Sequence, residues 1–205
     1  MAWSQNVEEQ KAVGAAALAR YLEIDPTNED MLVSKAQLFQ LRGRFDDALI
    51  LTDSMLQRDP DDPIAQWVKG VSLLRLGRVP EAVAIGDALV ERFPNSMHFL
   101  KAFAADAHYA AGDYAGAARL ARMAAAQISE ARMKGPVTGP VRLTLAAAEA
   151  RLGHLEGARA VLQDFYALVP GVRTLSAMQA WMYQTADLKG FQPLFDGLKL
   201  AGVSQ

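Results

Sequence analysis

Histidine is the side chain most often used for acid–base catalysis and metal binding near neutral pH, and it occurs three times in this 205-residue chain. His98, His108 and His154 stand 10 and 46 residues apart, so no two of them share one helical turn. The His-Glu-x-x-His motif, in which two imidazoles one turn apart hold zinc, does not occur. The histidines therefore predict neither a metal site nor a catalytic residue.

The other motifs that carry chemistry are also missing from the sequence. It has no Gly-x-x-x-x-Gly-Lys-Ser/Thr loop to cradle phosphates and no Gly-x-Ser-x-Gly turn to present a nucleophilic serine. Cysteine is absent, which excludes disulfides and thiolate-bound metals. We therefore expect that the protein is not an enzyme and that it requires no cofactor.

Charged residues gather in two places along the chain. Asp59, Asp61 and Asp62 form an acidic cluster, which is typical of helix capping and of a solvated connection. A loose basic stretch is typical of a helix face exposed to solvent. The alternative interpretation is a site that contacts an acidic partner or a phosphate. The stretch consists of Arg119, Arg122, Arg132, Lys134 and Arg142.

Composition limits the class of protein. A net charge of −2 creates no global field that would attract nucleic acid or anionic lipid, so we expect neither as a partner. Apolar residues make up 51% of the chain, enough for a continuous core, and the scarcity of β-branched runs favours helix over sheet. The first twenty residues do not resemble a signal peptide, and no run of about 18 apolar residues occurs. We expect a cytoplasmic protein that does not enter the membrane.

Prolines recur at a fixed interval. Pro26, Pro60 and Pro94 lie 34 residues apart, and each closes a similar phrase, such as Leu-Glu-Ile-Asp-Pro. A proline just beyond a helix cannot continue its hydrogen-bonded turns, so it marks a helix end. The sequence therefore predicts repeated helical units of about this length.

A second signal runs in step with the prolines. Gly43, Gly77, Gly112 and Gly153 are each followed by a large apolar residue and then by an alanine, as in Gly-Arg-Phe-Asp-Asp-Ala. The glycine allows a tight turn between two helices, and the alanine lets two backbones approach closely. The spacings are 34, 35 and 41 residues, and we assign the excess in the last one to a loop over 133–140, which holds two glycines and two prolines. Asp62 before Pro63 further predicts a helix N-terminus.

These residues resemble the tetratricopeptide repeat family, in which small residues recur near positions eight, twenty and twenty-seven and a proline near thirty-two. The pattern is carried by Ala36, Ala48 and Pro60; by Gly70, Ala82 and Pro94; by Ala105, Ala117 and Ala124; and by Ala146, Ala158 and Pro170. The resemblance implies an all-α fold, a right-handed α-solenoid of stacked antiparallel helix pairs with about eleven helices. We expect one repeat domain over 1–205. Its parts are a half repeat at 5–24, full repeats at 29–62, 63–96, 97–133 and 139–172, and a degenerate closing repeat at 173–205.

In this family the first helix of each pair lines a concave groove that binds peptides or partner helices. The resemblance places eleven residues at or beside the groove: Val33, Gln37, Gln40, Trp67, Val71, Leu74, Phe99, Phe103, Asp106, Tyr109 and Leu143. The lysines, arginines and asparagines with which some members hold acidic carboxylate tails are absent here. The middle of the set is instead apolar and aromatic, which is typical of a binding surface with Trp67 as its anchor. The aromatic residues equally suit packing against neighbouring helices, or against a terminal helix folded into the groove.

Two functional hypotheses follow. The first is a scaffold for protein–protein interaction that binds a peptide or helix of a partner in the apolar groove. The second is a self-assembling or regulatory module forming homo-oligomers, which the apolar residues Phe191, Leu194, Phe195 and Leu198 would favour. The closing phrase Gly-Leu-Lys-Leu-Ala-Gly is similar to the end of bacterial class III cyclase or winged-helix regulator proteins that carry such repeats.

Overall fold

The computed structural model describes residues 16, 20, 31–95, 97–130, 139–182 and 192–205. Within them the chain forms ten helices and no strand beyond one isolated bridge between Thr174 and Ser204. The predicted all-α fold is therefore confirmed. The helices are α2 (Leu32–Leu41), α3 (Phe45–Arg58), α4 (Pro63–Arg75), α5 (Val79–Arg92), α6 (His98–Ala110), α7 (Tyr114–Glu130), α8 (Pro140–Arg151), α9 (Leu155–Leu168), α10 (Leu175–Met182) and α11 (Gln192–Leu200).

Each full repeat expected from the sequence contains one pair of helices joined by a short turn. The four turn glycines, Gly43, Gly77, Gly112 and Gly153, have φ angles of 69°, 77°, 82° and 83°. Residues with a side chain rarely adopt this left-handed conformation, so the predicted role of the glycines is confirmed. Nearly all of the predicted half repeat at 5–24 and of the loop at 133–140 lies outside the described residues.

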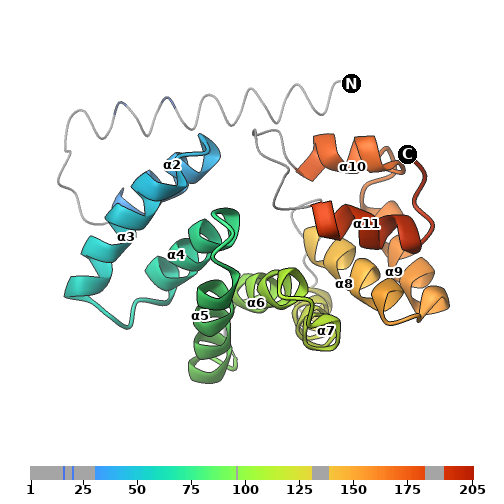
Figure 1. Cartoon of the computed structure of the whole chain (residues 1–205), viewed down its shortest axis with the longest axis horizontal. Helices are drawn as coiled ribbons and strands as arrows, with labels where there is room; N and C mark the ends of the chain where they lie inside the picture. Colours follow the sequence, from blue (N-terminus) through green and yellow to red (C-terminus); the bar gives the residue numbers. More distant parts are fainter. Residues whose placement is uncertain (1–15, 17–19, 21–30, 96, 131–138, 183–191) are drawn as a thin grey trace.

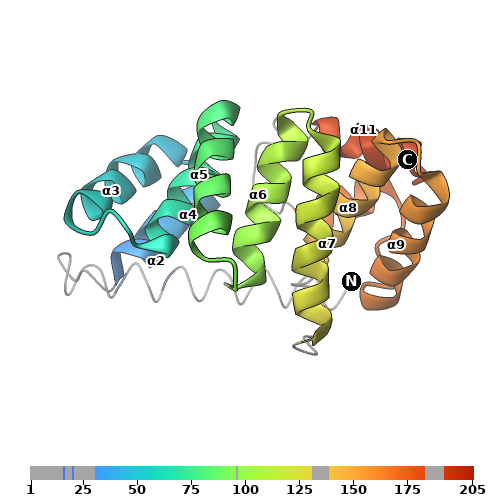
Figure 2. The ribbon, with the colours of Figure 1, turned by 90° about the horizontal axis from the view of Figure 1, so that it is seen from below.

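The pairs stack into a curved array (Figure 1). The first helix of each pair contacts the first helix of the next, α2 with α4, α4 with α6 and α6 with α8. The second helices α3, α5 and α7 pack between the first helices on either side. The first helices therefore lie on the inner side of the curve, and the view in Figure 2 shows the pairs side by side along it.

Small residues form the contacts between helices. Alanines at the predicted small positions, such as Ala36, Ala48 and Ala82, are completely buried. At the twenty-seventh position of two repeats, Leu89 and Phe165 replace the usual small residue and are also completely buried. Larger side chains at these two places therefore fill the core instead of disrupting the stack.

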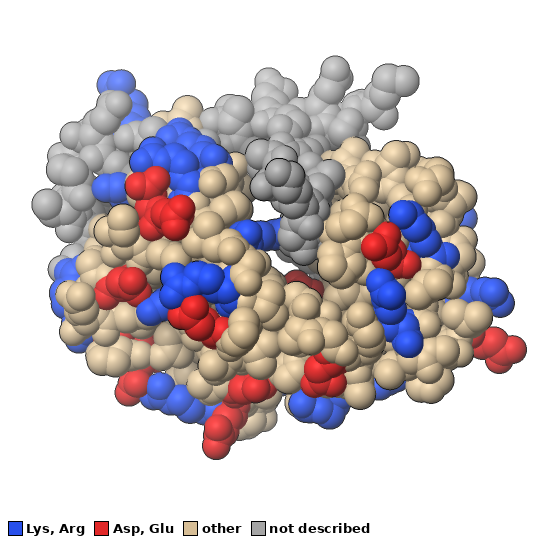
Figure 3. Space-filling view, in the orientation of Figure 1, with Lys and Arg blue, Asp and Glu red and all other residues tan. Residues whose placement is uncertain are grey.

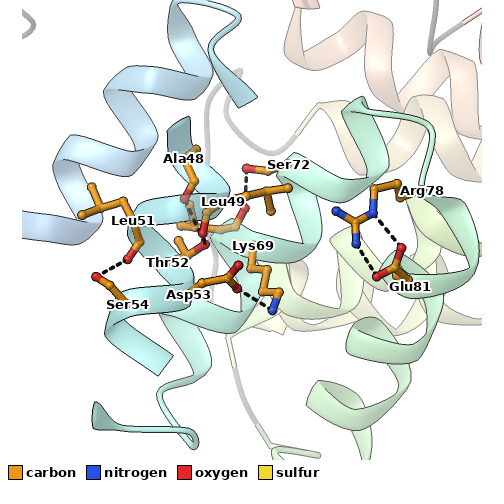
Figure 4. Close-up of polar contacts among 11 residues, drawn as sticks. Ala48, Leu49, Leu51, Thr52, Asp53, Ser54, Lys69, Ser72, Arg78 and Glu81 are labelled. Carbon is orange, nitrogen blue, oxygen red and sulfur yellow. Dashed lines mark hydrogen bonds and ion pairs between the residues drawn. The ribbon is translucent and has the colours of Figure 1, made fainter. Parts of the chain in front are cut away.

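Polar side chains fix the ends and the spacing of individual helices. The Asp62 carboxylate accepts hydrogen bonds from the backbone N–H groups of Ile64 and Ala65, at 2.8 and 3.2 Å, which confirms the predicted cap of α4. Lys69 of α4 forms an ion pair with Asp53 of α3 at 2.6 Å, and Figure 4 shows this link between the two pairs.

Two clusters of charged side chains connect neighbouring repeats at equivalent positions. His108 of α6 lies between Asp87 of α5 and Asp113 of the following turn, at N–O distances of 2.8 and 2.7 Å. Burial lowers the pKa of His108, but the hydrogen bonds that the protonated ring donates to the two aspartates outweigh this effect, so the pKa is raised. At the equivalent positions one repeat later, the shared central residue is acidic: Glu149 contacts both Arg122 and His154.

The last helix closes the array in an unexpected way. α11 packs mainly against α8 and only slightly against α6 and α10, so it lies on the inner face of the array and does not extend the stack of pairs. Leu194, Phe195 and Leu198 are buried by this packing. The chain is held there by a hydrogen bond from the Leu175 backbone N–H to the carbonyl of Ser204 at 2.8 Å. In Figure 1, α11 accordingly lies beside α8.

No helix in the described part of the chain is long and apolar enough to cross a bilayer.

Candidate partner-binding groove

The groove residues expected from the sequence fall into an open part and a covered part. Those on α2 and α4, together with Phe99 at the start of α6, keep part of their surface exposed. Tyr109 at the end of α6 and Leu143 on α8 do not, since Tyr109 is 4% exposed and Leu143 is completely buried. Gln40 and Asp106 are also partly exposed, but we reserve the name open groove for six residues: Val33, Gln37, Trp67, Val71, Leu74 and Phe99.

The aromatic pair at the centre of the open groove comes from two successive first helices. Trp67 of α4 and Phe99 of α6 have ring centroids 4.8 Å apart, with planes inclined at 58°. Both rings pack against the buried core of the neighbouring helices. Both also remain only partly buried, so each supports the array with one side and presents apolar surface with another.

Gln40 has a structural role at the edge of the open groove. Its side-chain amide donates to the carbonyl of Val68 at 2.8 Å and to the Ser72 hydroxyl at 2.9 Å. The hydroxyl in turn donates to the same carbonyl at 3.0 Å. Because its amide is used in joining α2 to α4, we leave Gln40 out of the proposed contact surface.

Phe103 belongs to the core. It is 4% exposed and packs across two glycines, Gly70 of α4 and Gly86 of α5. A Cβ atom at Gly70 would overlap the end of its ring, and one at Gly86 would lie 3.6 Å from it. The glycines thus make the space into which the ring fits, and little of Phe103 remains for a partner.

The covered part of the groove is occupied by the C-terminal helix. The Tyr109 hydroxyl donates to the carbonyl of Pro193 at 3.0 Å, and Gly197 of α11 lies directly against Tyr109 and Ala147. Packing against a terminal helix was one of the two interpretations that the sequence left open for the aromatic residues, and it applies to Tyr109. Leu143 lies in the same core cluster as the buried side of α11.

A small cavity lies where the open and covered parts meet. It has a volume of about 30 Å³, roughly the space of two water molecules. It brings together three residues expected in the groove, Leu74, Asp106 and Tyr109, and Figure 3 shows this face hollowed near its centre. Sequence reasoning missed the other lining residues because they come from off-stripe positions and from α11; they are Arg75, Ala110, Thr144, Pro193 and Leu194.

Asp106 is the polar centre of this cavity. The Thr144 hydroxyl of α8 donates to its carboxylate at 2.6 Å. Burial raises the pKa of Asp106 to about 6, although the hydrogen bond from Thr144 and the charge of Arg75 act to lower it. The carboxylate therefore titrates close to neutral pH, in contact with both the groove and the cavity.

Charged side chains elsewhere are used in pairing. Arg122 of the basic stretch contacts the buried carboxylate of Glu149. Arg132 and Lys134 lie outside the described residues. Within the described part of the chain, no group of three histidine or acidic side chains is placed to hold a metal ion.

Comparison with known proteins identifies the repeats. Models of the tetratricopeptide repeat match residues 33–96 and, separately, residues 100–123 and 139–164. A comparison with curated protein sequences gives no significant match.

Several solved structures share the fold. The thermophilic tetratricopeptide repeat protein TTC0263 of Thermus thermophilus is 23% identical, with a TM-score of 0.58 over 84% of this chain and 89% of that one. MamA of Desulfovibrio magneticus RS-1 is 16% identical, with a TM-score of 0.57 over 84% and 92%. A tetratricopeptide repeat protein of Parabacteroides merdae is 14% identical, with a TM-score of 0.56 over 98% and 77%. At these identities the likeness shows a common fold.

Proposed function

The chain belongs to the tetratricopeptide repeat family, whose fold is typical of non-enzymatic scaffolds for protein–protein interaction, and on that premise we propose that it binds an apolar segment of a partner protein in the open groove. The observation that carries the proposal is the Trp67–Phe99 pair, which lies on the inner face and remains partly exposed. Partly exposed aromatic side chains at the centre of a concave surface are frequent anchors of binding.

The composition of the open groove indicates the kind of segment that would bind. Five of its six residues are apolar, Gln37 is neutral, and none is charged. An acidic tail would find no lysine or arginine among them. An amphipathic helix or an extended segment with apolar side chains would bury its own surface together with that of Trp67, Val71 and Leu74.

Substitution of the anchor tests the proposal. Peptides are first selected on the purified protein from a random library, and their affinities are then measured by calorimetry. Removal of a central aromatic anchor costs about 2 kcal/mol or more, so Trp67→Ala should weaken binding roughly 30-fold. A matched control is Ile50→Ala, because Ile50 is 70% exposed on the outer helix α3 and should leave affinity unchanged.

The results can contradict the proposal in two ways. If Trp67→Ala keeps its helical circular dichroism and binds with wild-type affinity, the groove is not the binding surface. If Ile50→Ala weakens binding as much as Trp67→Ala, the outer face is involved instead.

Self-association was the second hypothesis. Three of the four residues that favoured it, Leu194, Phe195 and Leu198, are buried against the rest of the chain, and Phe191 lies outside the described residues. No observation on the described surface favours it over partner binding. Light scattering at high protein concentration tests it directly.

A further inference from the structure

α11 lies on the array as a bound helix would, and not as the next member of the stack. It packs mainly against α8 and only slightly against α6 and against α10, the nearest described helix before it in the sequence. The residues Leu194, Phe195 and Leu198 form its buried apolar face. Lys199 and Leu200 of the same helix are exposed. This is the arrangement of an amphipathic helix that places its apolar face in a groove.

The surface beneath α11 continues the open groove. Tyr109 and Leu143 occupy inner positions of successive repeats, and both are buried in the core cluster that contains the apolar face of α11. Leu74 of the open groove and Leu194 of α11 line the same small cavity, so the first turn of α11 lies at the end of the open groove. A segment that follows the inner face from α4 towards α8 therefore meets the place that α11 occupies.

The contacts that hold α11 do not depend on side-chain chemistry peculiar to it. The Tyr109 hydroxyl and the Arg151 guanidinium both donate to the backbone carbonyl of Pro193, at 3.0 and 3.4 Å. Gly197 contributes a close approach to Ala147 rather than a polar group. Another helix with a small residue at this place and apolar neighbours can supply a carbonyl and an apolar face equally well.

A partner helix replaces α11 only if it gains more than the attached helix does. α11 belongs to the same chain, which gives it an effective concentration at the site on the order of 1 mM. A partner helix with the same apolar pattern regains the contacts to α6 and α8. By continuing onto the open groove it also buries Trp67, Val71 and Leu74, which α11 leaves partly exposed.

We propose that α11 is a displaceable occupant of the partner site, which covers the α6–α8 half of the inner face until a partner helix takes its place. The partner is an amphipathic helix with apolar residues at the three buried places of α11 and a small residue where α11 has Gly197. The inference rests on the proposed groove function and extends the site beyond the open groove. Docking of α11 lowers the apparent affinity for such a helix in proportion to the small fraction of molecules in which α11 is released.

A synthetic peptide with the sequence of residues 192–205 tests whether the covered face accepts a helix from outside. Its affinity for the whole 205-residue chain is measured by fluorescence anisotropy. Leu198→Asp in the chain places a carboxylate in a buried position and opposes the docking of α11, so the peptide should bind this variant at least about tenfold more tightly than wild type. The matched control is Leu200→Asp, which adds the same charge at an exposed position of α11 and should leave the affinity unchanged.

Gly197→Ala provides a second route to release. A Cβ atom there would overlap the Tyr109 hydroxyl, while the face that receives the peptide stays the same. The peptide should bind this chain about fivefold more tightly than wild type, or better. A peptide that itself carries Gly197→Ala repeats the overlap and should bind more weakly than the unchanged peptide. Hydrogen exchange in α2 to α7 verifies that the array remains folded in each variant.

Two results would overturn the displacement of α11. One is that the peptide binds neither Leu198→Asp nor Gly197→Ala more tightly than wild type. The other is that Leu200→Asp raises the affinity as much as Leu198→Asp does.

The library-selected peptides separate this inference from the groove proposal. Those that depend on Trp67 should bind Leu198→Asp more tightly than wild type and should compete with the 192–205 peptide. If they bind both chains equally, the open groove stands as their site and the displacement of α11 is overturned. If no selected peptide depends on Trp67 while the 192–205 peptide still prefers Leu198→Asp, the open-groove proposal fails and the helix site beneath α11 is supported.

Discussion

Replacing Gly197 by alanine should release the C-terminal helix from the inner face. Gly197 lies in α11, against Tyr109 of α6 and Ala147 of α8. A Cβ atom at this position would overlap the Tyr109 hydroxyl and lie 2.9 Å from the Cβ and 3.2 Å from the carbonyl oxygen of Ala147. The hydroxyl has some freedom to move, but the Ala147 backbone is fixed within α8.

The magnitude follows from three contributions. Overpacking of a close contact costs about 1–3 kcal/mol. Displacing Tyr109 would also break its hydrogen bond to the Pro193 carbonyl, a further loss of about 1 kcal/mol. Alanine in place of glycine in a helix returns about 1 kcal/mol. Gly197→Ala should therefore destabilise the docked helix by roughly 1–3 kcal/mol.

Hydrogen exchange is the appropriate measurement, because a repeat array can open at one end without unfolding elsewhere. Protection should fall for the amides of 194–203 in Gly197→Ala, while α2 to α5 keep theirs. Tyr109→Phe removes the overlapping oxygen, so the double variant should recover about 1 kcal/mol or more relative to the sum of the two single changes.

A matched substitution provides the control. Gly157 of α9 also lies within a helix, but a Cβ atom there would meet only the Glu149 carboxylate at an ordinary 3.8 Å. Gly157→Ala should leave stability unchanged or raise it by about 0.5–1 kcal/mol. If Gly197→Ala behaves like this control, or if Tyr109→Phe does not rescue it, the close docking of α11 is refuted.

Three further predictions concern the array itself. The raised pKa of His108, between Asp87 and Asp113, means that its protonation stabilises the fold below about pH 6.5, the ordinary histidine value. This stability should be lost as the pH rises through the raised value. Urea denaturation of wild type and His108→Gln across this range should show the difference disappear at high pH; a constant difference would contradict it. Phe103→Ala empties a buried site and should cost about 3–5 kcal/mol, seen as a lower urea midpoint, whereas a change below about 1 kcal/mol would mean the ring is not core. Asp62→Ala removes the α4 cap and should cost about 1 kcal/mol in the same assay, with Asp62→Asn nearly neutral; equal loss in both would argue against capping.

The fold could be predicted from the sequence because the residues that specify its turns, caps and close contacts act locally. A left-handed turn requires glycine at Gly43 and its three counterparts, whatever the remainder of the chain does. A cap requires an acceptor at Asp62, just before Pro63. Complete burial at Ala48 follows from the same repeat, because two helices can approach closely only where the side chain is small.

The candidate site could be predicted from the sequence only in part, because apolar residues at helical spacing occur both in a core and on a binding surface. Trp67 and Leu143 occupy corresponding inner positions, yet Trp67 is partly exposed and Leu143 is completely buried. The difference depends on what lies against each helix. The sequence signal for a closing helix was present in Leu194, Phe195 and Leu198, but not the face on which it docks.

The sequence by itself determined the helix pairs, their turns and the stripe of inner positions, since each depends on the conformational preferences of a few neighbouring residues. The tertiary structure alone decided which of these inner positions are exposed. They form an open groove on α2, α4 and the start of α6, and they are covered by α11 at α8. That division depends on the fit of Gly197 against Ala147, fifty residues away in the chain. Contact between such distant residues is set by shape complementarity in three dimensions. The same helix contributes Pro193 and Leu194 to the cavity beside Asp106.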